Sequence, residues 1–175
     1  IHPRMGYVTR MRLVKVGLAN VNTTVGAFTA NVDRALHLAR ALAAEGTTVA
    51  VFPEQVVGGY PPEDLVQWQG FVDRQWMELS RFALETAALP MVSVLGVAVA
   101  HQGLRYNCAA VVAGGAVRGL VPKRKPPSST LFHDGPTFAP ARAGMARSAS
   151  RTCPNNCPGT VPAVMARLKN RERSS

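Results

Sequence analysis

The sequence predicts an α/β fold with a mixed sheet, and three observations support this class. Two segments, residues 28–45 and 63–88, carry apolar residues at the roughly 3.6-residue spacing of amphipathic helices. They alternate with short apolar runs rich in Val, which predict buried strands. The last two runs are joined directly by Gly114-Gly115, a pair typical of a tight β-hairpin.

The first half of the chain predicts strand, helix, strand. Arg12 to Ala19 predicts a strand, and Phe28 to Glu45 a helix that ends before Gly46. The apolar face of that helix consists of Val32, Ala35, Leu36, Ala39, Leu42 and Ala43. Thr47 to Phe52 predicts a second strand that is apolar on both sides, as expected for a strand covered on each face.

The second half predicts one long helix and three further strands. We expect the helix to run from Glu63 to Ala88 and to end at Pro90. The strands are predicted at Met91 to Val99, Arg105 to Val112 and Ala116 to Val121, with a turn at His101-Gln102-Gly103 between the first two.

The composition changes after about Ala141. Residues 141–175 hold 7 Lys and Arg against 1 acidic residue, whereas residues 1–140 hold 13 against 9. The last segment is also rich in Pro, Ser and Arg and has no hydrophobic periodicity. We therefore expect a partial domain at 12–142 and a basic tail at 143–175 that is disordered or out of frame, as in a truncated or frameshifted product.

Charge and hydrophobicity exclude several classes of function. The net charge of +10 comes mostly from the tail, and the body lacks the interleaved basic and aromatic residues of a nucleic-acid binder. No continuous apolar stretch reaches the about 18 residues of a membrane span. The three cysteines are an odd number, which favours a reducing, cytoplasmic location over a disulfide framework.

Two predicted strands end in the same pattern of Pro followed by an ionisable residue, Pro53-Glu54 and Pro122-Lys123. If these strands are neighbours, Glu54 and Lys123 meet at one edge of the sheet. A carboxylate beside an ammonium can exchange a proton with a substrate, and the ammonium can stabilise negative charge on a carbonyl oxygen. Spacing alone more often produces a helix cap and a surface charge than a catalytic pair.

Several short motifs together resemble the carbon–nitrogen hydrolase (nitrilase) superfamily. They are Phe52-Pro53-Glu54 with Gly59-Tyr60, Arg105-Tyr106-Asn107, and Gly119-Leu120-Val121-Pro122-Lys123. The segment Tyr60 to Leu65 and the opening 20–26 with Asn31 are similar to the N-terminal glutamine amidase domain of glutamine-dependent NAD+ synthetase. The resemblance covers roughly residues 12–142 and implies a nitrilase-like α-β-β-α sandwich, partial here and incomplete at the C-terminal side.

The resemblance also implies roles for single residues. Members hydrolyse an amide with a Glu-Lys-Cys triad, so Glu54 would be the general base and Lys123 would stabilise the tetrahedral intermediate. Tyr60 would line the glutamine pocket, and Asp134 occupies the place of a second acid near the lysine. Lys125 would replace Lys123 if the register shifted by two residues.

No cysteine fits the nucleophile of such a triad. Cys108 falls within a predicted strand and is expected to pack in the core. Cys153 and Cys157 form CPNNCP in the tail, without a preceding strand or a second pair of metal ligands. We therefore identify no nucleophile and expect no metal site.

The function that the resemblance implies is hydrolysis of L-glutamine to supply ammonia for the amidation of nicotinic acid adenine dinucleotide in NAD biosynthesis. The chain alone would be inactive, because the nucleophile and the ATP-binding synthetase domain are missing. No cofactor is expected here, since ATP and Mg are implied only for that absent domain. A homo-oligomer is compatible with the family. The alternatives are a fragment of another nitrilase-type amidase and a non-catalytic binding fragment.

Overall fold

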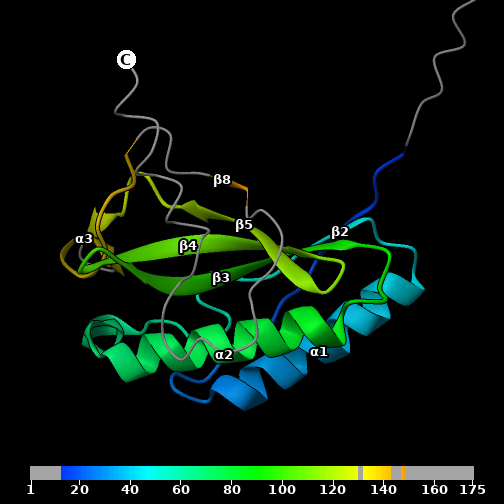
Figure 1. Cartoon of the computed structure of the whole chain (residues 1–175), viewed down its shortest axis with the longest axis horizontal. Helices are drawn as coiled ribbons and strands as arrows, with labels where there is room; N and C mark the ends of the chain where they lie inside the picture. Colours follow the sequence, from blue (N-terminus) through cyan, green and yellow to red (C-terminus); the bar gives the residue numbers. More distant parts are fainter. Residues whose placement is uncertain (1–12, 130–131, 143–146, 149–175) are drawn as a thin grey trace, which may run out of the picture.

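The fold is a mixed six-stranded sheet with two long helices packed against it (Figure 1). The computed structural model describes residues 13–129, 132–142 and 147–148. The strands of the sheet, in spatial order, are β1 (Val16–Leu18), β2 (Val49–Val51), β3 (Val92–His101), β4 (Leu104–Ala113), β5 (Ala116–Pro122) and β8 (Arg147–Ser148). The strands β1, β2 and β3 run parallel, and β3, β4, β5 and β8 are antiparallel, which confirms the predicted mixed sheet.

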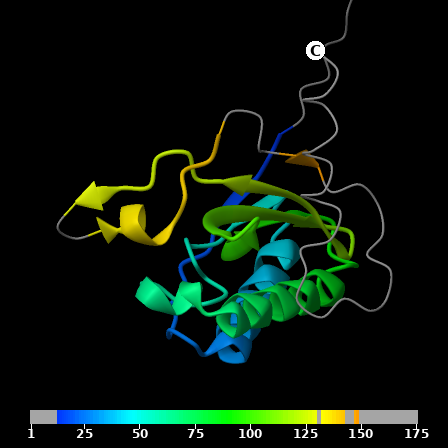
Figure 2. The ribbon, with the colours of Figure 1, turned by 60° about the vertical axis from the view of Figure 1, so that its left-hand side comes forward.

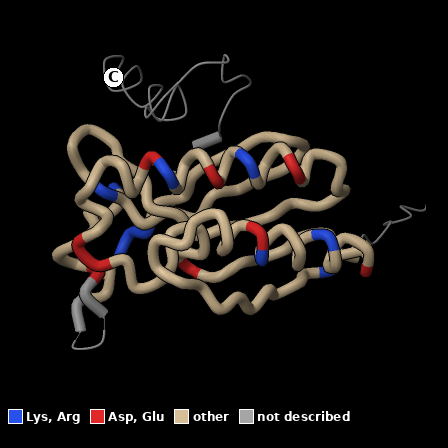
Figure 3. Tube along the Cα trace, turned by 90° about the horizontal axis from the view of Figure 1, so that it is seen from below, with Lys and Arg blue, Asp and Glu red and all other residues tan. Residues whose placement is uncertain are grey.

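Helices α1 (Phe28–Ala44) and α2 (Gln69–Glu85) cover the same face of the sheet (Figures 1 and 2). The core lies between them and the strands, and its largest fully buried apolar side chains include Leu36, Leu79, Phe82, Leu95 and Leu120. Each such side chain contributes roughly 1.5–3 kcal/mol on burial. The two helices are also tied together at the surface, where Arg81 pairs with Asp33, Glu78 and Glu85. Figure 3 shows charges of both signs interspersed along them.

The opposite face of the sheet carries apolar side chains that the described residues leave partly open. Val16, Leu18 and Val121 are exposed, and Val51 is half-buried. Ala50, the residue before Val51 in β2, points to the other face of the sheet and is fully buried. The second strand is therefore apolar on both faces, as the sequence indicated, whereas the described helices cover one face rather than both.

The turn before α1 is organised by Asn31. Its side chain is fully buried and bonds both backbone groups of Thr24, at 3.0 Å from the Thr24 N–H and 2.8 Å to the Thr24 carbonyl. Satisfying these groups fixes the loop 20–26 against the first turn of the helix. At the other end α1 stops as predicted, with Gly46 in the left-handed region at φ 76°.

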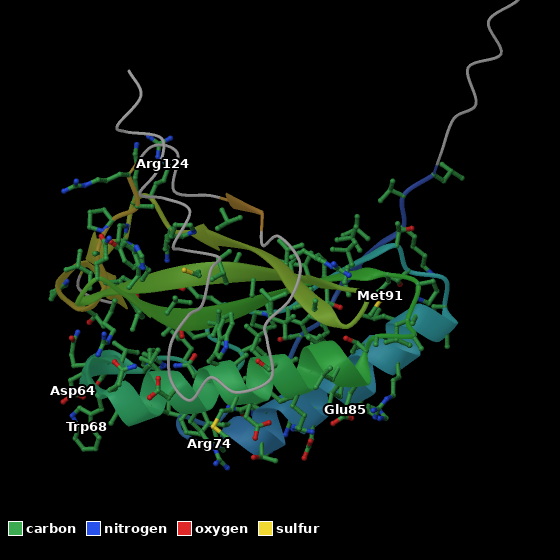
Figure 4. All side chains as sticks on the ribbon, in the orientation of Figure 1. Asp64, Trp68, Arg74, Glu85, Met91 and Arg124 are labelled. Atoms are coloured by element: carbon green, nitrogen blue, oxygen red, sulfur yellow. The ribbon has the colours of Figure 1, made fainter. Side chains whose placement is uncertain are left out.

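The prediction of one continuous helix from Glu63 to Ala88 is wrong. A 3-10 helix, η1 (Glu63–Gln67), comes first, Trp68 is extended, and α2 begins at Gln69. The Arg105 guanidinium explains the break, because it binds the carbonyls of Val66 and Gln67 at 2.7 and 3.1 Å. Those carbonyls would otherwise accept α-helical bonds. Trp68 points away from the sheet at the start of α2 (Figure 4).

The region beyond β5 contains short elements. A separate hairpin is formed by β6 (Ser128–Ser129) and β7 (Phe132–His133), followed by α3 (Asp134–Thr137). A further strand, Arg147–Ser148, pairs with Gly119 and Leu120 of β5, in the segment where the sequence has no hydrophobic periodicity. Backbone pairing of two residues needs no hydrophobic pattern, so the sequence carried no signal for it. None of the helices within the described ranges is long and apolar enough to span a membrane.

Gly96 in β3 allows the chain after β2 to lie directly against the sheet. A Cβ atom at this position would stand 2.2 Å from the backbone nitrogen of Gln55 and 2.6 Å from the Cα of Glu54. The segment is held there by backbone bonds from Phe52 N to Val94 O and from Gly96 N to Pro53 O, at 2.9 and 3.2 Å. Only glycine therefore permits this approach.

Replacing Gly96 by Ala should destabilise the protein by about 1–3 kcal/mol, the usual cost of overpacking, because backbone atoms rather than a flexible side chain must move. Gly70→Ala is the matched control. Gly70 lies in α2 with open space around it, so the added methyl should stabilise the helix by about 0.5–1 kcal/mol. Urea denaturation of both variants measures the difference, and equal stability of Gly96→Ala and the wild type would contradict the packing argument.

Candidate functional site

Glu54 lies at the carboxyl end of β2, where the chain leaves the sheet. The parallel strands β1 and β2 both end on this side, which is where open α/β sheets place their ligand sites. Its side chain is 43% exposed, so one side of the carboxylate is open to a substrate.

Lys123 directly follows β5 and reaches back to Glu54. Its Nζ lies 2.7 Å from Glu54 Oε1, and its backbone N–H bonds the carbonyl of Asn107 at 2.8 Å. The sequence analysis expected the two residues to meet if their strands were neighbours. The strands β2 and β5 are not neighbours, because β3 and β4 lie between them. The chain after β2 crosses over Gly96 of β3, so that the backbone of Glu54 already lies above the neighbouring strand and its side chain can reach Lys123.

Asp134, the first residue of α3, completes the ion cluster. Its Oδ2 lies 2.8 Å from Lys123 Nζ, and its side chain is only 7% exposed. Burial lowers the pKa of Lys123, but the hydrogen bonds to Asp134 and Glu54 outweigh it and raise this pKa above its usual value. Lys123 thus lies between the two carboxylates. The alternative assignment would have placed Lys125 there instead.

Tyr60 lies close enough to the charges of Glu54, Lys123 and Asp134 for them to affect its pKa. Burial raises the pKa of its phenol, the negative charges of Asp134 and Glu54 raise it further, and Lys123 lowers it. Its side chain is half-buried, and the preceding Gly59 has φ 86°. A Cβ on Gly59 would stand 2.6 Å from the Thr24 carbonyl oxygen, so the turn that carries Tyr60 packs directly on the loop before α1.

Two polar residues beneath the cluster were not predicted as site residues. Asn107 in β4 donates through Nδ2 to Glu54 Oε1 and to Asp134 Oδ2, the latter at 3.4 Å. Gln55 Nε2 donates to Asn107 Oδ1 at 2.9 Å. An asparagine within a mostly apolar strand was the available signal for Asn107. Gln55 had none, because a buried glutamine after a strand looks like a loop residue.

The cysteines do not join the cluster within the described residues. Cys108 packs in the core between Val97 and Pro122 of the adjacent strands, as expected. Cys153 and Cys157 lie outside the described residues. In the described part of the chain no group of three or more His, Cys, Asp and Glu residues could hold a metal ion.

Comparison with known sequences finds relatives among the glutamine-dependent NAD(+) synthetases. No family model matches the chain. The glutamine-dependent NAD(+) synthetase of Mycobacterium tuberculosis is 35% identical over 127 residues, which is 73% of this chain and 19% of that protein. The enzyme of the same name from Thermotoga maritima is 33% identical over 130 residues, covering 74% and 22%. The chain thus spans about a fifth of the length of these relatives.

Solved structures give the same answer for the fold. A glutamine-dependent NAD(+) synthetase from Cytophaga hutchinsonii superposes with a TM-score of 0.71 at 21% identity, over 75% of this chain and 22% of that one. An amidase from Nesterenkonia sp. gives 0.64 at 18% identity, over 78% and 51%; another structure describes the Nesterenkonia AN1 amidase as a member of the nitrilase superfamily. The chain is thus similar in sequence to part of the glutamine-dependent NAD(+) synthetases, and its fold is like that of these enzymes and of a nitrilase-superfamily amidase.

Proposed function

We propose that this chain supplies the base and the lysine of a glutamine-hydrolysing amidase site that provides ammonia for NAD+ synthesis. The observation that carries the proposal is the 2.7 Å contact between Lys123 Nζ and Glu54 Oε1 at the carboxyl end of the sheet. The names of the sequence relatives support glutamine as the substrate.

The proposed chemistry uses Glu54 as a proton carrier. Its carboxylate takes the proton from a thiol, whose sulfur then attacks the amide carbon of the substrate. The carbonyl π electrons move onto oxygen, and the Lys123 ammonium stabilises that oxyanion. Glu54 then returns the proton to the nitrogen, the C–N bond breaks and ammonia leaves. Water attacks the thioester carbon while Glu54 accepts a proton from it. The C–S bond then breaks, glutamate leaves, and Glu54 returns the proton to the sulfur.

In this proposal, Oε2 is the oxygen of Glu54 that accepts and returns the proton. Lys123 and Asn107 both donate to Oε1, and Oε2 takes part in neither bond. A carboxylate oxygen that is already bonded twice has less capacity to accept a proton. The two oxygens therefore divide the tasks, since Oε1 fixes the orientation and Oε2 faces the reactants.

Cys108 is unsuited to be the thiol. It is 2% exposed, and burial raises the pKa of its thiol to about 12. A nucleophilic cysteine needs the opposite environment, with a lowered pKa and access to the substrate. We propose that the reacting thiol is a residue other than Cys108, and that the reaction at Glu54 and Lys123 uses no metal ion or nucleotide.

Two further expectations remain proposals. We propose that the chain self-associates through exposed apolar positions such as Leu18, which is 80% exposed, since such surface is usually covered in solution. We also propose a cytoplasmic location, because the buried Cys108 is a free thiol.

The first prediction of the proposal concerns ammonia release. The purified chain should release none from glutamine, because its described thiol is buried. A chimera in which this chain replaces the matching 127 residues of the Mycobacterium tuberculosis relative should hydrolyse glutamine. In that chimera Glu54→Gln and Lys123→Ala should each lower kcat at least about 100-fold, whereas Lys125→Ala should not.

NAD+ formation from added ammonia controls for folding of the chimera. If the chimera forms NAD+ from ammonia but does not hydrolyse glutamine, the proposal is wrong for this chain. Equal losses in Lys123→Ala and Lys125→Ala would remove the assignment of the lysine.

The second prediction uses the pKa of Cys108. A thiol whose pKa is higher in the folded than in the unfolded state stabilises the fold below its unfolded pKa of 9.0 and loses this contribution as the pH rises toward about 12. Over that window the free energy of unfolding should fall by an extra about 1.4 kcal/mol per pH unit, the value for one proton.

Cys108→Ala should lose this one-proton slope but keep any alkaline loss due to Tyr60 and Lys123. Urea denaturation at intervals from pH 8 to 11 measures both slopes. Parallel slopes for the wild type and the variant would show that Cys108 ionises as easily in the folded state as in the unfolded chain.

A further inference from the structure

Asn107 is a buried polar residue that contacts the ion cluster of Glu54, Lys123 and Asp134. It lies in β4 opposite Ala98 of β3, among apolar neighbours, and is 5% exposed. A buried side-chain amide costs free energy unless its donors and acceptor are satisfied. The hydrogen-bond partners of Asn107 therefore indicate its role.

The same two oxygen atoms bind both Asn107 and Lys123. Asn107 Nδ2 donates to Glu54 Oε1 and Asp134 Oδ2, and Lys123 Nζ donates to these atoms at 2.7 and 2.8 Å. The two donors thus hold the pair of carboxylates from two directions. The carbonyl of Asn107 also accepts the backbone N–H of Lys123 at 2.8 Å.

Gln55 fixes the orientation of the Asn107 amide. Its Nε2 donates to Asn107 Oδ1 at 2.9 Å, so the amide nitrogen must point toward the carboxylates. Gln55 is fully buried, has φ 51°, and is the residue after Glu54. Base and orienting residue are therefore positioned by the same close approach to Gly96.

A neutral donor solves an electrostatic problem in this cluster. Two carboxylates share one ammonium, and two negative charges held on the same group repel each other. An amide N–H stabilises the charged form of both without adding a second positive charge. Tyr60 is another titratable group that the cluster affects, and its phenol is neutral at physiological pH.

We propose that Asn107 is a positioning residue of this site, which holds Glu54 and Asp134 on the Lys123 ammonium so that Glu54 keeps one oxygen for the reactants. This inference rests on the proposed function for the identity of the base. It adds a residue that acts through Glu54 and Asp134 rather than on the substrate.

Lysine NMR on the whole chain tests the proposal without any need for activity. The sequence has four lysines, so labelling at Cε and Nζ gives few signals, and Lys123→Arg assigns the relevant one. In the wild type the pKa of Lys123 should be the highest of the four. Asn107→Leu, which keeps the shape of the side chain, should shift it down toward the ordinary value, as should Glu54→Gln.

Asn31→Leu is the matched control, because it removes another buried asparagine amide whose partners lie outside the cluster. It should lower stability while leaving the pKa of Lys123 unchanged. An unchanged pKa in Asn107→Leu beside a lowered one in Glu54→Gln would overturn the positioning role. An unchanged pKa in both would overturn it too, since the cluster would not exist in solution.

A second measurement on the wild type applies if Asn107→Leu does not fold. The side-chain NH2 protons of Asn107 should exchange slowly with solvent, and their shifts should follow the protonation of the carboxylates between pH 7 and 3. Fast exchange and shifts that ignore this titration would overturn the proposal. The proposed glutamine hydrolysis could fail in the chimera while these results stand, so the two claims are separable.

Discussion

The close approach of the chain to Gly96 is the constraint on which the site depends. With no Cβ in the way, the segment after β2 stays bonded to β3 through Pro53 and places Glu54 and Gln55 at fixed positions. One of these residues is the exposed carboxylate, and the other is buried and orients Asn107. A loop free to move could not present a carboxylate and its supporting amide from consecutive residues.

Arg105 provides a second constraint from the neighbouring strand. It ends the 3-10 helix η1 by binding its last carbonyls, and its own carbonyl accepts the N–H of Ala139 at 2.7 Å. Gln67 reaches the carbonyl of Thr137, the last residue of α3. The segment that follows Tyr60 and the helix that begins with Asp134 are thereby fastened to the same end of β4, next to Asn107.

The sequence revealed the parts of this arrangement that rest on periodicity and local chemistry. The α1 stop at Gly46, the Gly114-Gly115 hairpin and the positions of the strands along the chain as far as β5 follow from hydrophobic spacing and backbone preferences. The break at Trp68 and the short pairing of β8 could not be predicted, because one depends on a distant guanidinium and the other on backbone groups alone. Glu54 and Lys123 stood out at strand ends, whereas Asn107 needed the tertiary structure to acquire a role.

In the proposed reaction, the burial of the cluster limits the directions from which a thiol and a substrate can approach it. Asp134 and Asn107 form its closed side, with side chains that are almost fully buried, and Lys123 is intermediate with 32% of its side chain exposed. Glu54 is the most open member at 43%. A thiol that gives its proton to Glu54 must therefore approach from the Glu54 side, on which Oε2 lies free of the bonds from Lys123 and Asn107. The oxyanion must then form within reach of the exposed part of Lys123, so sulfur, amide carbon and ammonium are confined to one surface of the cluster.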